Sequence, residues 1–196
     1  MDSEEIEKLC ERLNMDDHDE PVVQMAPDLI EEGKEKLDLC LVGKVFGNKI
    51  VNLEGPNDVA ERVWRTSRRI KVEAMGISNI FMFHFGCKDD RQRVLFGGPW
   101  NFNNQIISLL KPTGIGMISA MDFSEVLFWI KFLNVPIICR SDLCAMLWGE
   151  MVGPMEEVES EGPVLRARVS IDITKPLCRG LKILIDDSNE LGTILI

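Results

Sequence analysis

The sequence KVEAMGISNIFMFHF, residues 71–85, decides the fold class. β-Branched and aromatic residues fill its two ends, and the turn formers Gly76 and Asn79 separate them. The stretch therefore predicts two antiparallel strands, 71–77 and 79–85, joined by a tight turn. Apolar side chains occupy both alternating rows of the second strand, which indicates that both faces of the sheet are covered.

The segments on either side extend this hairpin to a split β-α-β unit. Before it, residues 39–46 predict a strand and residues 57–69 a helix; after it, a second helix begins at Asp89 or Asp90, and residues 105–110 predict a further strand. The order β-α-β-β-α-β predicts an α+β protein whose first unit is ferredoxin-like, or RRM-like. Such a unit has four antiparallel strands with two helices on one face.

The rest of the chain predicts a smaller β-rich unit of order β-α-β-β-β. Its expected elements are a strand at 127–135, a helix at 141–151, a hairpin formed by 155–160 and 165–173, and a strand at 181–185 that can pair with 192–196. The expected organisation is therefore an acidic arm and linker at 1–38, an RRM-like domain at 39–112 and a second subdomain at 113–196.

The negative charge of the chain is concentrated in its first 38 residues. The whole sequence has 22 Lys and Arg against 32 Asp and Glu, a net charge of −10. Residues 1–38 hold 14 acidic and 4 basic residues, which gives −10, so the remainder is neutral. We expect a short helix at 3–13, then a linker with one short strand at 22–25. The arm is either a solvated tail or a competitor for a phosphate-binding surface.

A basic helix face is the strongest electrostatic signal. On a helix at 57–69, four arginines share the arc opposite the apolar one, and a lysine follows directly. The residues are Arg62, Arg65, Arg68, Arg69 and Lys71. Arginine donates two parallel hydrogen bonds to a phosphate, so this face predicts contact with a nucleic-acid backbone. The alternative is an ordinary solvated helix face, and in an RRM this helix lies behind the binding surface.

Aromatic residues on strand 79–85 form the second signal. Phe81, Phe83 and Phe85 alternate and therefore share one face, while Met82 and His84 share the other. RNA-binding RRMs stack bases on aromatics of this strand, which makes Phe81, Phe83 and His84 candidate stacking residues. The alternative is that the phenylalanine row belongs to the core, with His84 and Met82 as the more exposed pair.

Several motifs resemble a known family. They are LVGKV at 41–45, FHF at 83–85, VLFGGPWNF at 94–102 and LCRGL at 177–181, after an acidic amphipathic opening. Together they resemble a plant domain-of-unknown-function family found in retroelement-derived, LINE-type and gag-like proteins. The resemblance implies an RRM-like first unit and a nucleic-acid-binding role. It also implies a following CCHC zinc knuckle, whose C-x2-C-x4-H-x4-C pattern this sequence lacks.

Other classes of function find little support in the sequence. It has two histidines, scattered cysteines without a CxxC pair, and no phosphate-binding loop or nucleophile elbow, so we expect no metal, no cofactor, no catalysis and no small-molecule substrate. The reduced cysteines, the acidic N-terminus and the lack of a long apolar run favour an intracellular protein away from membranes. We therefore expect a non-catalytic module that binds RNA or single-stranded DNA; the alternative is a gag-like assembly module that self-associates.

Overall fold

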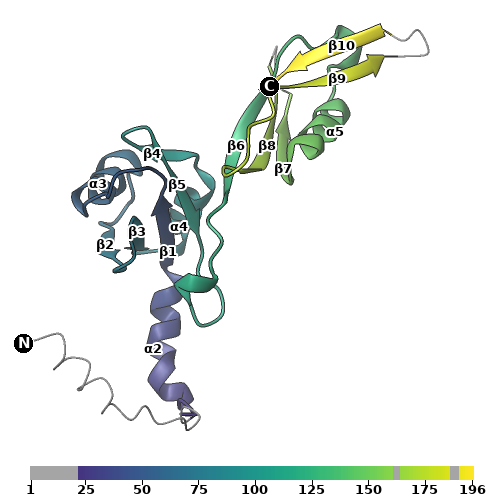
Figure 1. Ribbon diagram of the computed structural model, residues 1–196. Helices are drawn as coiled ribbons and strands as arrows, with labels where there is room; N and C mark the ends of the chain where they lie inside the picture. Colours follow the sequence, from purple (N-terminus) through teal and green to yellow (C-terminus); the bar gives the residue numbers. More distant parts are fainter. Residues whose placement is uncertain (1–21, 161–163, 186–189) are drawn as a thin grey trace, which may run out of the picture. The chain divides into compact units, whose positions relative to one another are not determined.

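The computed structural model describes residues 22–160, 164–185 and 190–196. The helix expected at 3–13 lies outside these residues, as does the turn expected at 161–163. The described elements form an α+β fold built on antiparallel sheets, as predicted (Figure 1). Contacts unite residues 33–196 in one compact unit.

The first sheet has five strands in the order β2–β3–β1–β5–β4, and adjacent strands are antiparallel. The strands are β1 (Cys40–Val45), β2 (Lys71–Ala74), β3 (Ile80–His84), β4 (Trp100–Phe102) and β5 (Gln105–Leu110). Without β4, this is the strand order of the predicted ferredoxin-like unit. The sequence-based prediction missed β4, a three-residue strand that returns to β5 through Asn103 and Asn104, both with positive φ.

One face of this sheet carries the main core, below the helices α3 (Glu54–Asp58) and α4 (Lys88–Phe96) and the π-helical turn η1 (Val59–Val63). Trp64 follows η1 and is fully buried. Its ring centroid lies 4.8 Å from that of Phe83, 6.1 Å from that of Phe85 and 6.0 Å from that of Trp100. The phenylalanine row of β3 therefore belongs to the core that joins the helices to the sheet.

The opposite face of the sheet is covered by the chain that follows β5. Phe123 is buried there against Val42 and Ile80, and Met121 and Ile118 pack on the same cluster. The short 3-10 turn η2 (Ile118–Ala120) leads into this contact. The prediction that both faces are covered is thus confirmed, and the open sheet face on which an RRM binds RNA is occupied by the chain itself.

Part of the linker predicted at 14–38 is a helix; residues 14–21 lie outside the described residues. Residues Val22 and Met25 are not in a strand, and α2 (Pro27–Asp38) follows them. Proline fits the first helical turn because its missing N–H would have no partner there, and Asp28 favours the same end of the helix. The linker interpretation gave too much weight to Pro27 and Gly33 as chain breakers.

The end of α2 is attached by one carboxylate. Asp38 forms ion pairs with Lys88 on α4 and, at 3.0 Å, with Lys111 after β5, and it also accepts from Arg91. Hydrogen bonds from Lys88 and Lys111 hold the pKa of the Asp38 carboxyl well below its usual range. Asp38, the last residue of the predicted acidic arm, therefore attaches the end of α2 to α4 and to the segment after β5.

The C-terminal half contains a three-stranded sheet in the order β6–β8–β7 and a hairpin of β9 and β10. Its elements are β6 (Glu125–Phe132), the 3-10 turn η3 (Ile137–Cys139), α5 (Asp142–Val152), β7 (Met155–Glu159), β8 (Leu165–Asp172), β9 (Gly180–Ile185) and β10 (Glu190–Leu195). The Ser141 Oγ accepts from the Cys144 backbone N–H at 3.3 Å and caps α5. Trp148 packs edge-on to Phe132 in a second core.

Candidate functional site

The predicted basic helix is shorter than expected, and most of its arginines lie on a loop. The helical turns end at Val63, and Arg65 has a φ of 45°, which an α-helix cannot contain. Arg62 remains on η1, Arg65, Arg68 and Arg69 lie on the loop, and Lys71 begins β2. We call residues 65–71 the basic loop. The prediction of one continuous helix face at 57–69 is therefore wrong.

Ser67 explains why the helix stops where it does. The Asp90 carboxylate of α4 accepts from the Ser67 N–H at 2.8 Å and from its Oγ at 2.5 Å. The Asp90 side chain thus provides the Ser67 backbone N–H with an acceptor in place of a helical carbonyl. Arg93 donates to the Asp90 carboxylate at 3.1 Å and to the Trp64 carbonyl at 2.8 Å. The hydrogen bonds from Ser67, the largest cause, hold the pKa of Asp90 well below its usual range. The basic loop is thus fixed to α4.

Three of the five predicted phosphate-binding cations form ion pairs with carboxylates. Arg62 lies 3.5 Å from Asp58, Arg69 lies 2.8 Å from Glu61, and Lys71 lies 2.5 Å from Glu73. All six side chains are substantially exposed, and exposed pairs of this kind contribute about 0–1 kcal/mol. These cations are therefore partly neutralised but not locked in place.

Arg65 and Arg68 differ from the other three cations. Both are exposed, and within residues 22–160, 164–185 and 190–196 no carboxylate forms an ion pair with either guanidinium. Arg68 donates to the Gly86 carbonyl at 3.2 Å, which leaves its charge uncompensated. These two arginines are the part of the predicted surface that the structure leaves open to an anion.

The predicted aromatic platform is not accessible. Phe81 is 2% exposed and Phe83 1%, and both side chains lie in the core under Trp64. The stacking expectation for these two residues is therefore wrong, because alternation places them on the helix-covered face. His84 lies on the opposite face, is partly exposed, and is engaged by neighbours on β1 and β2.

A thiol, an imidazole and a carboxylate form a hydrogen-bonded chain across three strands. The Cys40 Sγ lies 3.1 Å from the His84 Nδ1, and the His84 Nε2 lies 3.0 Å from the Glu73 Oε2. The sequence analysis missed this row of hydrogen bonds because it depends on strand register: Cys40 lies opposite His84, and His84 lies opposite Lys71. Hydrogen bonds from Lys71 first, and then from His84, lower the pKa of Glu73.

This arrangement has the residue types of a cysteine nucleophile with its base, but not the environment. Cys40 is 1% exposed, and its Sγ also lies 3.0 Å from the Lys36 carbonyl. Desolvation raises the pKa of the thiol, so the reactive thiolate is disfavoured. We therefore interpret the hydrogen bonds among Cys40, His84 and Glu73 as a structural link between β1, β3 and β2.

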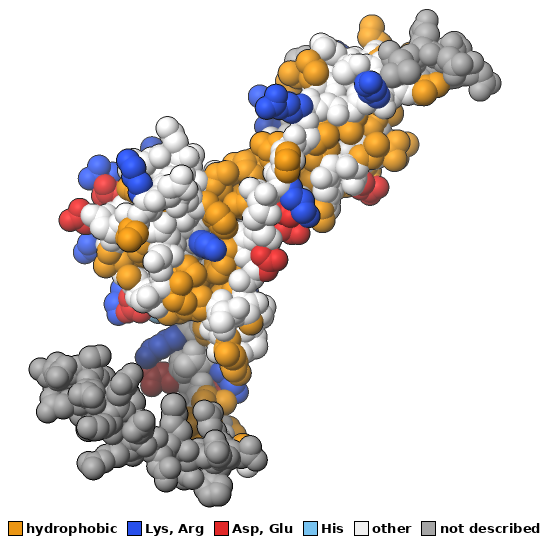
Figure 2. Space-filling view, in the orientation of Figure 1, with side chains coloured by type: hydrophobic (Ala, Val, Ile, Leu, Met, Phe, Trp, Pro, Cys, Tyr) orange, Lys and Arg blue, Asp and Glu red, His pale blue; other side chains and the backbone are white. Residues whose placement is uncertain are grey.

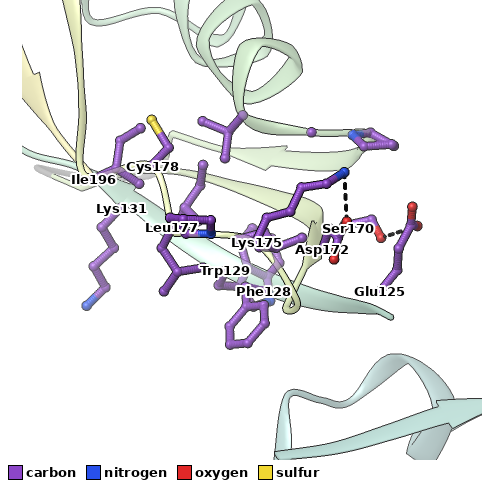
Figure 3. A pocket seen from close by; sticks show the side chains of 16 residues that line it. Glu125, Phe128, Trp129, Lys131, Ser170, Asp172, Lys175, Leu177, Cys178 and Ile196 are labelled. Carbon is purple, nitrogen blue, oxygen red and sulfur yellow. Dashed lines mark hydrogen bonds and ion pairs between the residues drawn. The ribbon is translucent and has the colours of Figure 1, made fainter. Parts of the chain in front are cut away.

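A cavity of about 540 Å³ lies in the C-terminal half, between β6 and the segment that follows β8 (Figure 3). Trp129 and Leu177 are among the apolar residues that line it. Its polar groups are mostly paired: Lys175 lies 2.8 Å from Asp172, and Ser170 donates to Glu125 at 2.8 Å. Lys175 and Thr174 lower the pKa of Asp172 to about 2. Lys175 and Asp172 neutralise each other, whereas Lys131 and Glu125 form no ion pair with another described residue.

Among the described residues, no group of three or more His, Cys, Asp or Glu side chains is placed to hold a metal ion. No helix in the same part of the chain has the length and apolarity needed to cross a membrane.

Comparisons with known proteins bear on the first sheet only. A search of curated proteins found no match to the chain. Residues 33–111, which contain the whole five-stranded sheet and both of its covering helices, match the model of a protein family. The resemblance to a domain-of-unknown-function family is thereby confirmed for this segment. Residues 33–111 are similar to the family described as Domain of unknown function (DUF4283).

Proposed function

We propose that this chain is a non-catalytic nucleic-acid-binding module of a plant retroelement-derived protein, and that it contacts the phosphate backbone of RNA or single-stranded DNA through its basic loop. The observation that carries the proposal is the pair of exposed guanidinium groups, Arg65 and Arg68, without carboxylate partners among the described residues. Both stand on a segment that Asp90 fixes to α4. A fixed segment loses less conformational entropy when it binds.

The remaining cations add to this surface when phosphate is present. Arg62, Arg69 and Lys71 form exposed ion pairs that stabilise the chain only weakly. A nucleic acid presents closely spaced phosphates, so it can replace Asp58, Glu61 and Glu73 as the partner of each cation. We expect between two and five phosphate contacts, depending on how many pairs exchange.

The contact is expected to be independent of base sequence. Phe81 and Phe83 are buried, and Phe123 covers the opposite face of the sheet. Base readout in an RRM requires stacking on an open sheet. Phosphate contact carries no sequence information directly, so the affinity should be modest and strongly dependent on salt.

Fluorescence anisotropy with a labelled 20-nucleotide RNA or single-stranded DNA tests the proposal across a salt series. Each phosphate contact to a single strand contributes about 0.7 to the slope of log K against log salt. The double variant Arg65→Gln/Arg68→Gln should therefore lower the slope by about 1.4. The matched control is Arg179→Gln/Lys182→Gln, which removes two exposed cations in the C-terminal half and should leave the slope unchanged.

Two results would reject the proposal. One is an absence of binding at low salt, which would leave the gag-like assembly alternative. The other is an equal loss of slope in the control variant, which would mean that net charge, not the basic loop, attracts the nucleic acid.

Deletion of residues 1–21 removes 9 acidic and 2 basic residues and should strengthen binding if the arm competes with phosphate.

A further inference from the structure

The exposed side of α5 carries four large apolar side chains beside two carboxylates, Asp142 and Glu150. Leu143 is 77% exposed, Leu147 59% and Met151 61%. Together with residues before the helix they form what we call the α5 patch: Ile137, Ile138, Leu143, Met146, Leu147 and Met151. Figure 2 shows hydrophobic side chains gathered over the part of the surface where α5 lies.

The other side of α5 is apolar. Trp148 and Ala145 are buried against the three-stranded sheet. Contiguous exposed apolar patches mark interaction surfaces. The α5 patch therefore requires a partner, and the charges beside it indicate which one.

Two charges of opposite sign lie at the two ends of this patch, and a third, Asp142, lies at its edge, about 100° from Leu143. Arg140 directly precedes the helix, and its Nε lies 3.5 Å from the Val135 carbonyl. Glu150 falls within the exposed arc, about 20° from Leu143 at 100° per residue. Neither charge forms an ion pair with any other described residue. A purely apolar partner would bury the Glu150 carboxylate without compensation, which is costly.

We propose that the α5 patch is covered by the α5 patch of a second copy of this chain, packed antiparallel about a two-fold axis. Residues 140 and 150 are equidistant in sequence from residue 145, near the middle of the patch. A two-fold axis at that level places Arg140 of each copy beside Glu150 of the other. The interface then contains two such Arg–Glu pairs, one on each side of the axis, as an isologous interface requires. This proposal does not depend on nucleic-acid binding.

The size of the patch predicts a weak dimer. The exposed fractions of its six side chains amount to about four fully exposed ones, or about 400 Å² per copy at about 100 Å² each. Burial of about 800 Å² in total is less than the 1,200 Å² or more typical of stable interfaces. We therefore expect association that depends on concentration and not an obligate dimer.

Sedimentation equilibrium of the full chain in reducing buffer tests the proposal, from 5 to 500 μM. The weight-average mass should rise from 22.2 kDa towards twice that value. Leu147→Glu should abolish the rise, since it places a carboxylate at the centre of the patch. Arg140→Glu and Glu150→Arg alone should each weaken the dimer at least fivefold, because each juxtaposes like charges.

The decisive variant is the double exchange Arg140→Glu/Glu150→Arg. It restores both opposite-charge contacts in a two-fold dimer, so association should return to within about threefold of the original. Glu156→Arg, at an exposed position on β7, is the matched control and should have no effect. Far-UV circular dichroism checks that each variant is folded.

Three outcomes would overturn the proposal. A mass that stays at the monomer value at every concentration would leave a different protein as the occupant of the patch. A dimer that Leu147→Glu does not affect would use another surface. A double exchange no better than the single variants would show that the two charges do not meet across a two-fold axis.

Discussion

Replacement of Trp64 should remove the contact that holds the basic loop over the first sheet. Its side chain is fully buried among Phe83, Phe85 and Trp100, and Arg65 is the next residue. A buried tryptophan removes about 150–250 Å² of surface from water, which corresponds to about 4–6 kcal/mol. Measured substitutions of this size cost about 3–5 kcal/mol. We expect Trp64→Ala to lower the free energy of unfolding by about 4 kcal/mol.

Trp64→Phe should cost much less. It keeps an aromatic ring against Phe83 and removes the Trp64 Nε1–H, a buried donor without a partner among the described residues. An unsatisfied buried donor costs about 1–3 kcal/mol, so its removal offsets part of the lost contact area. We expect a loss below about 2 kcal/mol and little change in nucleic-acid binding.

Urea unfolding followed by far-UV circular dichroism measures both losses. Val63→Ala, at the half-exposed preceding residue, is the control and should change the free energy by less than about 0.5 kcal/mol. The reasoning is refuted if Trp64→Ala costs under about 1 kcal/mol. It is also refuted if Trp64→Phe costs as much as Trp64→Ala, because the retained ring and the removal of the unpaired N–H would then together give no stabilisation.

Three further substitutions test separate parts of the fold. The pKa of Asp90 is lowered in the folded chain, chiefly by Ser67. The ionised Asp90 therefore stabilises the fold above about pH 4, and this contribution is lost as the pH falls towards the pKa of the folded state. The difference in free energy of unfolding between the original chain and Asp90→Asn should accordingly narrow in urea titrations from pH 6 to 3. Ser141→Ala removes the α5 cap and should cost about 1 kcal/mol in the same assay. Gly43→Ala places a Cβ 2.7 Å from the Phe83 ring and should cost about 1–3 kcal/mol, with a lower melting temperature.

The strand pairing of the first sheet could be predicted because its signals are local. The two ends of 71–85 alternate about a turn that contains Gly76 and Asn79, and the structure has β2 and β3 there. α2 was missed because, in sequence, a proline that begins a helix cannot be told from a proline that ends one. β4 was missed because three residues are too few for a periodic pattern.

The basic loop shows where sequence reasoning stops. The sequence shows directly that five cations lie within residues 62–71. Helical periodicity alone could not reveal that Asp90, about 20 residues further along the chain, would bind Ser67 and end the helix. The link between Cys40 and His84 likewise depends on which residues of β1 and β3 are opposite each other. Non-local partners of this kind leave no periodic trace in the sequence.

The apolar cover formed by residues 118–123 determines where the chain can be cut. The family match ends at residue 111, so a fragment designed on that boundary would lose Phe123 and expose Val42 and Ile80 to water. Exposed apolar surface of this kind promotes aggregation. An expression fragment for the first sheet should therefore extend past Phe123, although the recognisable homology stops well before it.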